Sequence, residues 1–136
     1  MIILAVDYGD ARTGLAVCDK FEFLASPAGV VFEAYEPKVI KAIAEKAKEV
    51  KAELLIVGLP KNMDGSSGER AIKCTEFAQK LQEETGIETK MVDERLTTCS
   101  AHKALSQTNV RGKKRKAVVD AVSAVFILES FLQSRK

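Results

Sequence analysis

Short continuous apolar runs alternate along this chain with longer segments in which apolar residues recur at helical spacing. Ile2–Val6 and Leu54–Leu59 are uninterrupted and contain β-branched residues, which is typical of strands buried on both faces. Leu15–Cys18 follows the first run after a polar, glycine-flanked turn, so these two strands are expected to form a β-hairpin. Phe21–Phe32 predicts a third strand, and a proline and a glycine inside it indicate an edge or a bulge.

The segments with helical spacing follow the third and later predicted strands. Four segments have an apolar stripe with polar residues on the opposite face or, in the last one, apolar residues nearly all round: Glu36–Val50, Glu69–Thr85, Thr97–Gln107 and Ala117–Leu132. Gly86 is expected to cap the second helix, and Glu88–Asp93 predicts a fifth strand. A three-stranded meander followed by alternating helices and strands predicts an α/β fold, with a mixed five-stranded sheet and helices on both faces.

Length and composition restrict the class of protein. The 136 residues, of which 46% are hydrophobic, are enough for one domain with a substantial core, so residues 1–136 are expected to form a single domain. Three widely spaced cysteines without a C-x-x-C pair disfavour a disulfide framework and a zinc site. No apolar run reaches the roughly 20 residues of a membrane helix, and no signal peptide is evident. These features predict a cytoplasmic protein without a membrane partner.

The last expected helix contains an acidic residue in an otherwise apolar stretch. Asp120 lies between Val119 and Ala121, and the small residues around it would let the helix pack closely over the sheet. A buried carboxylate must be paired, hydrogen-bonded, protonated or bound to a metal. An ion pair with Lys116 or Arg12 is the structural alternative to a functional role.

Two other acidic positions follow predicted strands. Asp7 comes directly after the first strand, and Asp93 or Glu94 ends the fifth. Carboxylates that converge at the end of a sheet, with Asp120 above them, are the ligands that Mg²⁺ or Mn²⁺ requires for phosphoryl transfer. For Asp7 alone, the capping of an ordinary turn is the alternative.

Basic residues cluster directly before the last expected helix. The net charge of +2 is too small to indicate nucleic acid by itself, so the distribution of charge is the more informative feature. A solvated loop is the alternative interpretation; the functional one is that these side chains hold substrate phosphates while the acids hold metal. The residues expected to bind substrate are Arg12, Arg95, Lys113, Lys114, Arg115 and Lys116.

Four segments of the chain resemble the signature blocks of the YqgF family, also called RuvX-type Holliday junction resolvases or pre-16S rRNA nucleases. In order, they are DYGDARTG (7–14), VGLPKNMDGSSGERA (57–71), VDERLTT (92–98) and KAVVDAVSAVFILES (116–130). The resemblance implies a ribonuclease H-like fold and a cytoplasmic, metal-dependent nuclease that processes the 5′ end of pre-16S rRNA in ribosome biogenesis. Its catalytic, metal-binding acids carry over to Asp7, Asp93 or Glu94, and Asp120; strand alternation favours Glu94.

Other functions compete with this one. The same phosphodiester hydrolase site would serve a resolvase of four-way DNA junctions. A resolvase needs two active sites in one assembly and is expected to be a homodimer, whereas a nuclease that acts on RNA can be a monomer. A non-catalytic RNA-binding assembly factor would bind pre-rRNA and cleave nothing. Actin-like and sugar-kinase-like nucleotide-binding proteins share an acid-plus-glycine hairpin, but usually need two such domains to enclose ATP.

Overall fold

The computed structural model describes residues 1–9, 11–59, 68–93 and 112–134. Those ranges contain five strands and three helices. In chain order they are β1 (Ile3–Asp7), β2 (Thr13–Cys18), β3 (Ala25–Val31), α1 (Glu36–Val50), β4 (Leu54–Leu59), α2 (Glu69–Thr85), β5 (Thr89–Asp93) and α4 (Gly112–Ser134). The expected helix Thr97–Gln107 lies outside the described residues.

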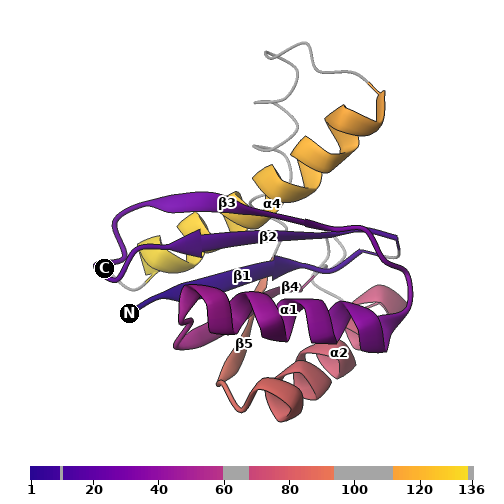
Figure 1. Cartoon of the computed structure of the whole chain (residues 1–136), viewed down its shortest axis with the longest axis horizontal. Coiled ribbons are helices and arrows are strands. Elements are labelled where there is room, and N and C mark those ends of the chain that lie inside the picture. The colour runs from indigo at the N-terminus through magenta and orange to yellow at the C-terminus, as the bar shows by residue number, and fades with distance from the viewer. Residues whose placement is uncertain (10, 60–67, 94–111, 135–136) are drawn as a thin grey trace.

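The strands form one mixed sheet in the order β3-β2-β1-β4-β5 (Figure 1). The hairpin pairs β1 with β2 antiparallel, β2 with β3 antiparallel, and β4 joins β1 in parallel with Ile3 opposite Leu54. β5 lies parallel to β4 at the other edge, with Asp93 opposite Leu59. β1 and β4 are therefore interior strands, which explains why both are continuous apolar runs.

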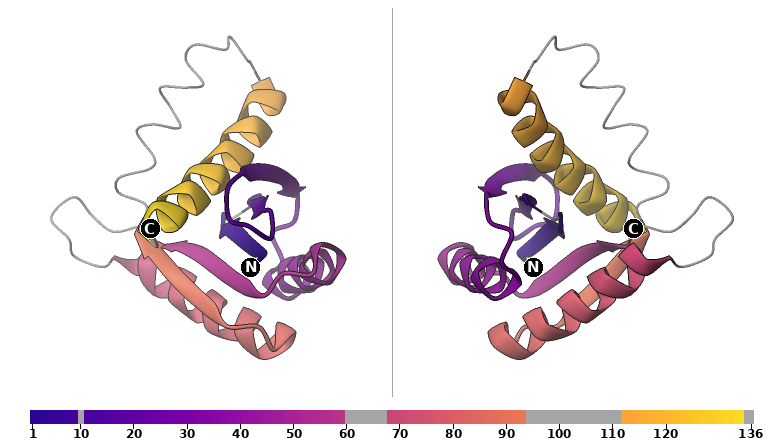
Figure 2. Two further views of the ribbon diagram at one scale, coloured as in Figure 1. Left: turned by 90° about the vertical axis from the view of Figure 1, so that its left-hand side faces the viewer. Right: turned by 90° about the vertical axis from the view of Figure 1, so that its right-hand side faces the viewer.

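Helices cover the two faces of the sheet and define two apolar cores (Figure 2). One core contains Leu4 and Val6 of β1 with the apolar stripes of α1 and α2, including Ile43 and Phe77. The other contains the alternate β1 residues and a stripe of α4: Ile3, Ala5, Ala124, Ile127, Leu128 and Leu132. This arrangement confirms the predicted fold class of a mixed five-stranded sheet with helices on both faces.

The third strand is shorter than the sequence predicts. β3 begins at Ala25 rather than Phe21, because the Asp19 carboxylate accepts hydrogen bonds from the backbone N–H groups of Phe23 and Leu24 and closes a turn. The predicted edge position and bulge are confirmed: Leu15 pairs with Gly29 and Ala16 with the residue two before it, which leaves one β3 residue unpaired.

The helix ends follow their local sequences. α1 begins next to Pro37 in its first turn, and Lys51 ends it in the left-handed conformation with φ 59°. Gly86 ends α2 with φ 70°, as predicted, because glycine adopts this conformation without steric cost. No helix within the described ranges is long and apolar enough to cross a membrane.

Candidate active site

Asp7 is the last residue of β1 and lies on the face of the sheet that α4 covers. Along β1, Leu4 and Val6 pack into the core under α1 and α2, whereas Ile3 and Ala5 pack against α4. Because strand side chains alternate between faces, Asp7 belongs with Ile3 and Ala5. It is half-buried and lies opposite Gly14 of β2, at the end of the sheet where the parallel strands β1 and β4 both terminate.

Asp120 lies in α4, one helical turn before Ala124. Ala124 and Leu128, which the sequence places on the same helix face as Asp120, are fully buried against the sheet. The described side chains of α4 begin at Val122, so the carboxylate of Asp120 lies outside them. Figure 1 shows the C-terminal part of α4 running behind the strands and its N-terminal part extending past them, on the side where β1 ends.

The acid at the end of β5 is only partly described. Asp93 is the last residue of the strand, but its side chain is outside the described set, and Glu94 and Arg95 lie outside it entirely. Just before them, Met91 packs toward the core under α1 and α2, whereas Val92 packs toward the core under α4. The structure thus brings Asp7 and α4 to one face, and leaves the meeting of the three acids as a prediction.

The basic run occupies the first turns of a helix. The sequence predicts a loop before a helix that starts at Ala117, but α4 begins at Gly112 and therefore includes Lys113–Lys116. The physical reason is that Lys and Arg are good helix formers and that neither proline nor glycine interrupts the chain after Gly112. The side chains of this run lie outside the described set.

A buried tyrosine next to Asp7 connects β1 to both helices of the opposite face. Tyr8 is only 6% exposed, and its ring stacks on Phe77 with centroids 3.8 Å apart and planes 6° from parallel. Its hydroxyl donates a hydrogen bond to the Glu36 carboxylate at 3.3 Å, and the same carboxylate forms an ion pair with Lys80 at 2.8 Å. Burial, with the Glu36 carboxylate, raises the pKa of Tyr8 to about 12, so the hydroxyl stays a donor at neutral pH.

Arg70 holds the backbone directly after Asp7. Its guanidinium donates a hydrogen bond to the carbonyl oxygen of Tyr8 and lies 5.4 Å from the centroid of the Tyr8 ring. This contact joins residues 62 positions apart, so the sequence does not predict it. The alternation of Leu4, Val6 and Tyr8 was the available signal for burying the ring, but no local pattern identified Arg70 as its partner.

The turn after Tyr8 is tight enough to require glycine. A Cβ atom on Gly9 would lie 2.1 Å from the carbonyl oxygen of Arg12, far inside van der Waals contact. The close approach brings Arg12, which is half-buried, to the same end of the sheet as Asp7. Gly9 is therefore a structural requirement of the hairpin that carries both residues.

The acidic residues predicted at this end of the sheet would determine which metal the site suits. Carboxylate oxygens are hard ligands that favour Mg²⁺ or Mn²⁺ over metals that prefer thiolate or imidazole. Among the side chains that the structure describes, no three His, Cys, Asp or Glu residues are grouped as metal ligands. Cys18 and Cys74 are buried, one in each of the two cores, as the sequence predicts.

Comparison with known proteins identifies the family. The sequence model of the RuvX family, described as Holliday junction resolvase, matches residues 1–134. The chain belongs to the RuvX family. The predicted resemblance to YqgF or RuvX proteins is thereby confirmed.

Relatives within the RuvX family align over nearly their full length. A protein of Clostridium novyi named "Putative pre-16S rRNA nuclease" is 40% identical over 134 residues, covering 98% of this chain and 99% of the relative. A protein of Halothermothrix orenii with the same name is 39% identical over 132 residues, covering 97% and 94%. The match therefore includes the segments that carry Asp7, Asp93, Glu94 and Asp120.

Solved structures share the fold at low sequence identity. RuvC of T. thermophilus in complex with a Holliday junction substrate matches with a TM-score of 0.63 and 12% identity, over 99% of this chain and 95% of that one. The Fowlpox virus resolvase in complex with Holliday junction DNA matches with a TM-score of 0.62 and 10% identity, over 99% of both chains. These likenesses confirm the ribonuclease H-like fold that the sequence predicts.

Proposed function

We propose that this protein is a divalent-metal-dependent nuclease that hydrolyses phosphodiester bonds in structured RNA, specifically at the 5′ end of pre-16S rRNA. The observation that carries the proposal is the position of Asp7, at the carboxyl end of an interior strand and on the face that α4 covers. Membership of the RuvX family and the names of the relatives from Clostridium novyi and Halothermothrix orenii support it. Residues 1–136 would act as a single domain in the cytoplasm.

The proposed catalytic and metal-binding residues are Asp7, Glu94 and Asp120. Asp120 is one turn before the buried Ala124, so helical spacing would put it on the stripe of α4 that packs on the side of the sheet carrying Asp7. Glu94 is favoured over Asp93 because, in an extended chain, the residue two positions after Val92 returns to the face of Val92. Mg²⁺ or Mn²⁺ bound there would activate water and stabilise the leaving oxygen.

Cationic side chains would hold the substrate around this centre. Arg12 shares the β1–β2 hairpin with Asp7, and Arg95 follows Glu94 in sequence. Lys113–Lys116 occupy the N-terminal turns of α4, seven to four residues before Asp120. Phosphate contacts of this kind position nucleic acid without reading its sequence, so binding is expected to weaken steeply with salt.

A four-way DNA junction is the second candidate substrate. The description of the RuvX family as Holliday junction resolvase favours it, as do the junction complexes of RuvC and the Fowlpox virus enzyme. Symmetric cleavage of a junction requires a homodimer, whereas trimming of an RNA end requires one active site only. The substrate and the oligomeric state are therefore linked predictions.

One assay separates these functions. Purified protein is incubated with an end-labelled pre-16S rRNA fragment and with a labelled four-way DNA junction, in Mg²⁺, in Mn²⁺ and in EDTA. We expect metal-dependent cleavage of the RNA and none in EDTA. Symmetric cuts in the junction alone would make the protein a resolvase. Salt-sensitive RNA binding without any cleavage would replace the nuclease proposal with the assembly-factor function.

Gly9→Ala will impair cleavage more than it impairs folding. The new Cβ would press on the Arg12 carbonyl, so the hairpin must open; overpacking of this kind costs about 1–3 kcal/mol. A displacement of catalytic groups by about 1 Å can lower the rate roughly 10²-fold. The measurements are the cleavage rate and the free energy of unfolding in denaturant.

Gly86→Ala is the matched control for this prediction. Gly86 has φ 70° at the end of α2, where the left-handed conformation costs a non-glycine residue about 1–2 kcal/mol, but a Cβ there would meet no atom within 4 Å. Its cleavage rate should match that of the wild type. If the two variants lose activity in proportion to stability, the hairpin has no special role in placing Asp7.

A further inference from the structure

Arg12 and Phe32 directly adjoin the paired ends of β2 and β3, at the end of the sheet where Asp7 lies. β2 and β3 pair with Thr13 opposite Val31 and Gly14 opposite Val30. Continuing this antiparallel register by one residue sets Arg12 opposite Phe32. Directly opposed residues have Cβ atoms roughly 5 Å apart, so the guanidinium and the ring are within reach of one another.

Both side chains belong to the face of the sheet that carries Asp7. Val31 packs toward the core under α1 and α2, so Phe32 follows on the opposite face, which α4 covers. In β2, Leu15 belongs to the core under α1 and α2 and Ala16 to the core under α4, which by alternation also assigns Arg12 to the α4 face. The carboxylate of Asp7, the guanidinium of Arg12 and the ring of Phe32 therefore follow one another across the end of the sheet where β1 ends.

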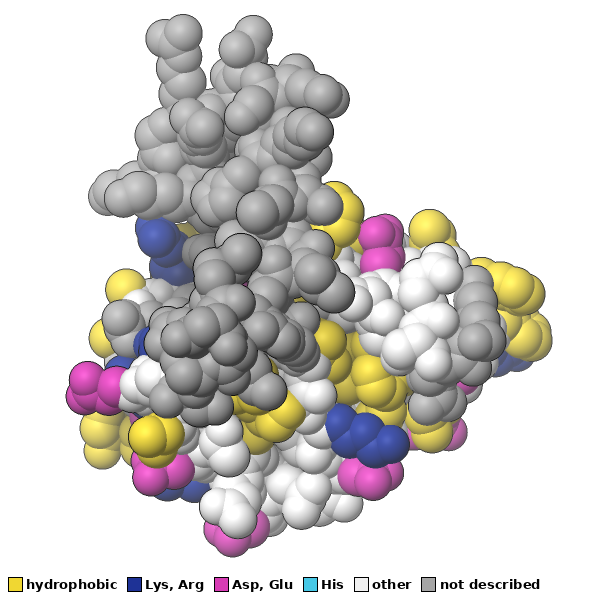
Figure 3. Space-filling model, turned by 180° about the vertical axis from the view of Figure 1, so that it is seen from behind, with side chains coloured by type: hydrophobic (Ala, Val, Ile, Leu, Met, Phe, Trp, Pro, Cys, Tyr) yellow, Lys and Arg dark blue, Asp and Glu magenta, His cyan; other side chains and the backbone are white. Residues whose placement is uncertain are grey.

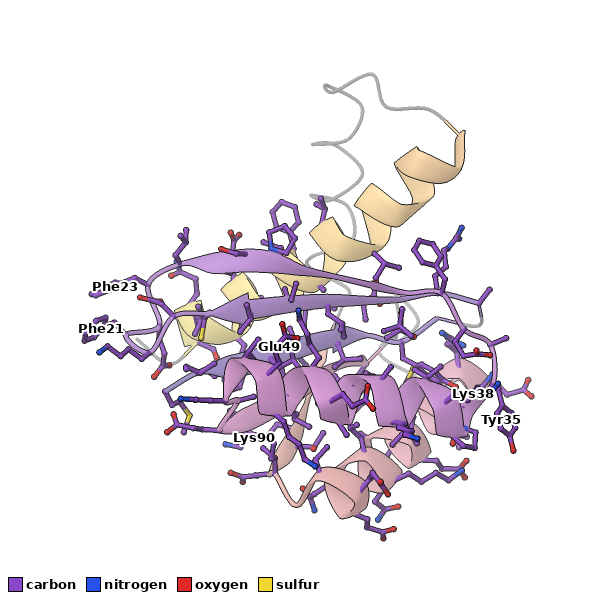
Figure 4. The ribbon with its side chains drawn as sticks, viewed as in Figure 1. Phe21, Phe23, Tyr35, Lys38, Glu49 and Lys90 are labelled. Atoms are coloured by element: carbon purple, nitrogen blue, oxygen red, sulfur yellow. The ribbon has the colours of Figure 1, made fainter. Side chains whose placement is uncertain are left out.

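Phe32 is 67% exposed, although the preceding residue, Val31, packs against the core under α1 and α2. β3 and β1 are separated by β2 alone, so the ring is displaced from Asp7 by about 10 Å across the strands. Tyr35, also exposed, lies at this same end (Figure 4). An exposed aromatic ring beside a cation and close to a phosphodiester-cleaving centre has the chemistry that binds an unstacked nucleobase.

We propose that Phe32 is a stacking platform for an unpaired base of the nucleic-acid substrate, with Arg12 holding the adjoining phosphate. This inference deepens the proposed nuclease function, on which it rests, and defines the substrate class as nucleic acid with at least one unpaired nucleotide beside the cleaved bond. A base stacks on an aromatic ring whatever its identity, so the platform selects unpaired structure rather than sequence. An RNA end that emerges from a helix provides such a nucleotide.

The chain contains a matched control at the other end of β3. Phe23 is 79% exposed and precedes β3, whereas Phe32 follows it. Figure 4 shows Phe21 and Phe23 together at the end of the sheet opposite Tyr35, and Figure 3 shows hydrophobic side chains gathered at that edge of the molecule. Phe23 is therefore an exposed phenylalanine that flanks the same strand at its other end, distant from Asp7, and it is expected to contribute nothing to base stacking.

The test measures binding of an RNA duplex with a short single-stranded overhang, in EDTA so that no strand is cut. The fluorescent base 2-aminopurine is placed at each of the first unpaired positions in turn. For the wild type, we expect binding to change the fluorescence at one of these positions. Phe32→Ala should lose that change and bind the overhang RNA about ten-fold more weakly, while its affinity for a blunt duplex stays unchanged. Phe32→Trp should retain both properties, and Phe23→Ala should behave as the wild type.

Every other result contradicts either the stacking platform or the nuclease proposal. Equal binding by Phe32→Ala and the wild type, or an equal loss on the blunt duplex, would overturn the stacking platform. A change from dimer to monomer in Phe32→Ala, measured by sedimentation, would assign the ring to contact with a second copy of the chain and would also overturn it. Fluorescence and affinity do not require cleavage, so stacking without any metal-dependent cutting would refute the nuclease proposal alone. Cleavage without an effect of Phe32 would refute the platform alone.

Discussion

Asp7→Asn and Asp120→Asn will each abolish metal-dependent cleavage while the fold persists. Asparagine preserves the size of the side chain but removes the negative charge that a hard divalent cation requires. Loss of a residue that acts in one catalytic unit lowers the rate on the order of 10⁴-fold. The measurements are cleavage of labelled RNA in Mg²⁺ and the far-ultraviolet circular dichroism spectrum of each variant.

Asp19→Asn is the matched control for these variants. Asp19 closes the turn before β3 by accepting backbone hydrogen bonds from Phe23 and Leu24, which an asparagine oxygen also accepts. That variant should cleave at the wild-type rate. Full activity of Asp7→Asn would remove the proposed site altogether. The same assay distinguishes the acids after β5, since Glu94→Gln should lose activity and Asp93→Asn should retain it.

Phe77→Ala will cause the largest loss of stability among single substitutions in the core under α1 and α2. Phe77 is fully buried, and truncation of such a side chain costs about 3–5 kcal/mol. The variant also loses the stacked contact with Tyr8, which adds about 0.5–1.5 kcal/mol for an aromatic pair. Tyr8 follows Asp7 directly, so cleavage by the folded fraction should fall as well. The measurement is equilibrium unfolding in urea, with activity assayed below the transition.

Ile72→Ala provides the comparison on the same helix. Ile72 is exposed on α2, so its truncation should change the free energy of unfolding by no more than about 0.5 kcal/mol. The loss in free energy of unfolding expected for Phe77→Ala approaches the total stability of a typical domain. Phe77→Leu therefore serves as a milder variant, which is expected to lose less than about 1.5 kcal/mol and to weaken cleavage. Unaltered stability and activity in Phe77→Leu would show that the Tyr8 stack does not support the site.

Interior strands and amphipathic helices were predictable because their signals are local. α1 and β4 have the predicted bounds, since an uninterrupted apolar run or a stripe at helical spacing needs no knowledge of distant residues. The start of α4 was wrong by five residues, at Gly112 instead of Ala117. A run of charged residues before an apolar helix favours a loop, but the helix propensity of Lys and Arg continues the helix here.

The sequence by itself determined the strands and helices of the sheet and the acidic residue at the end of β1. The patterns that predict burial and turns lie in residues that are neighbours along the chain. Only the tertiary structure decided that Asp7 shares a face with α4, that Arg70 holds the carbonyl next to it, and that Thr13 pairs with Val31, beside Arg12 and Phe32. Strand register and helix packing bring together residues that are far apart along the chain, and a shift of one residue would turn each side chain to the other face.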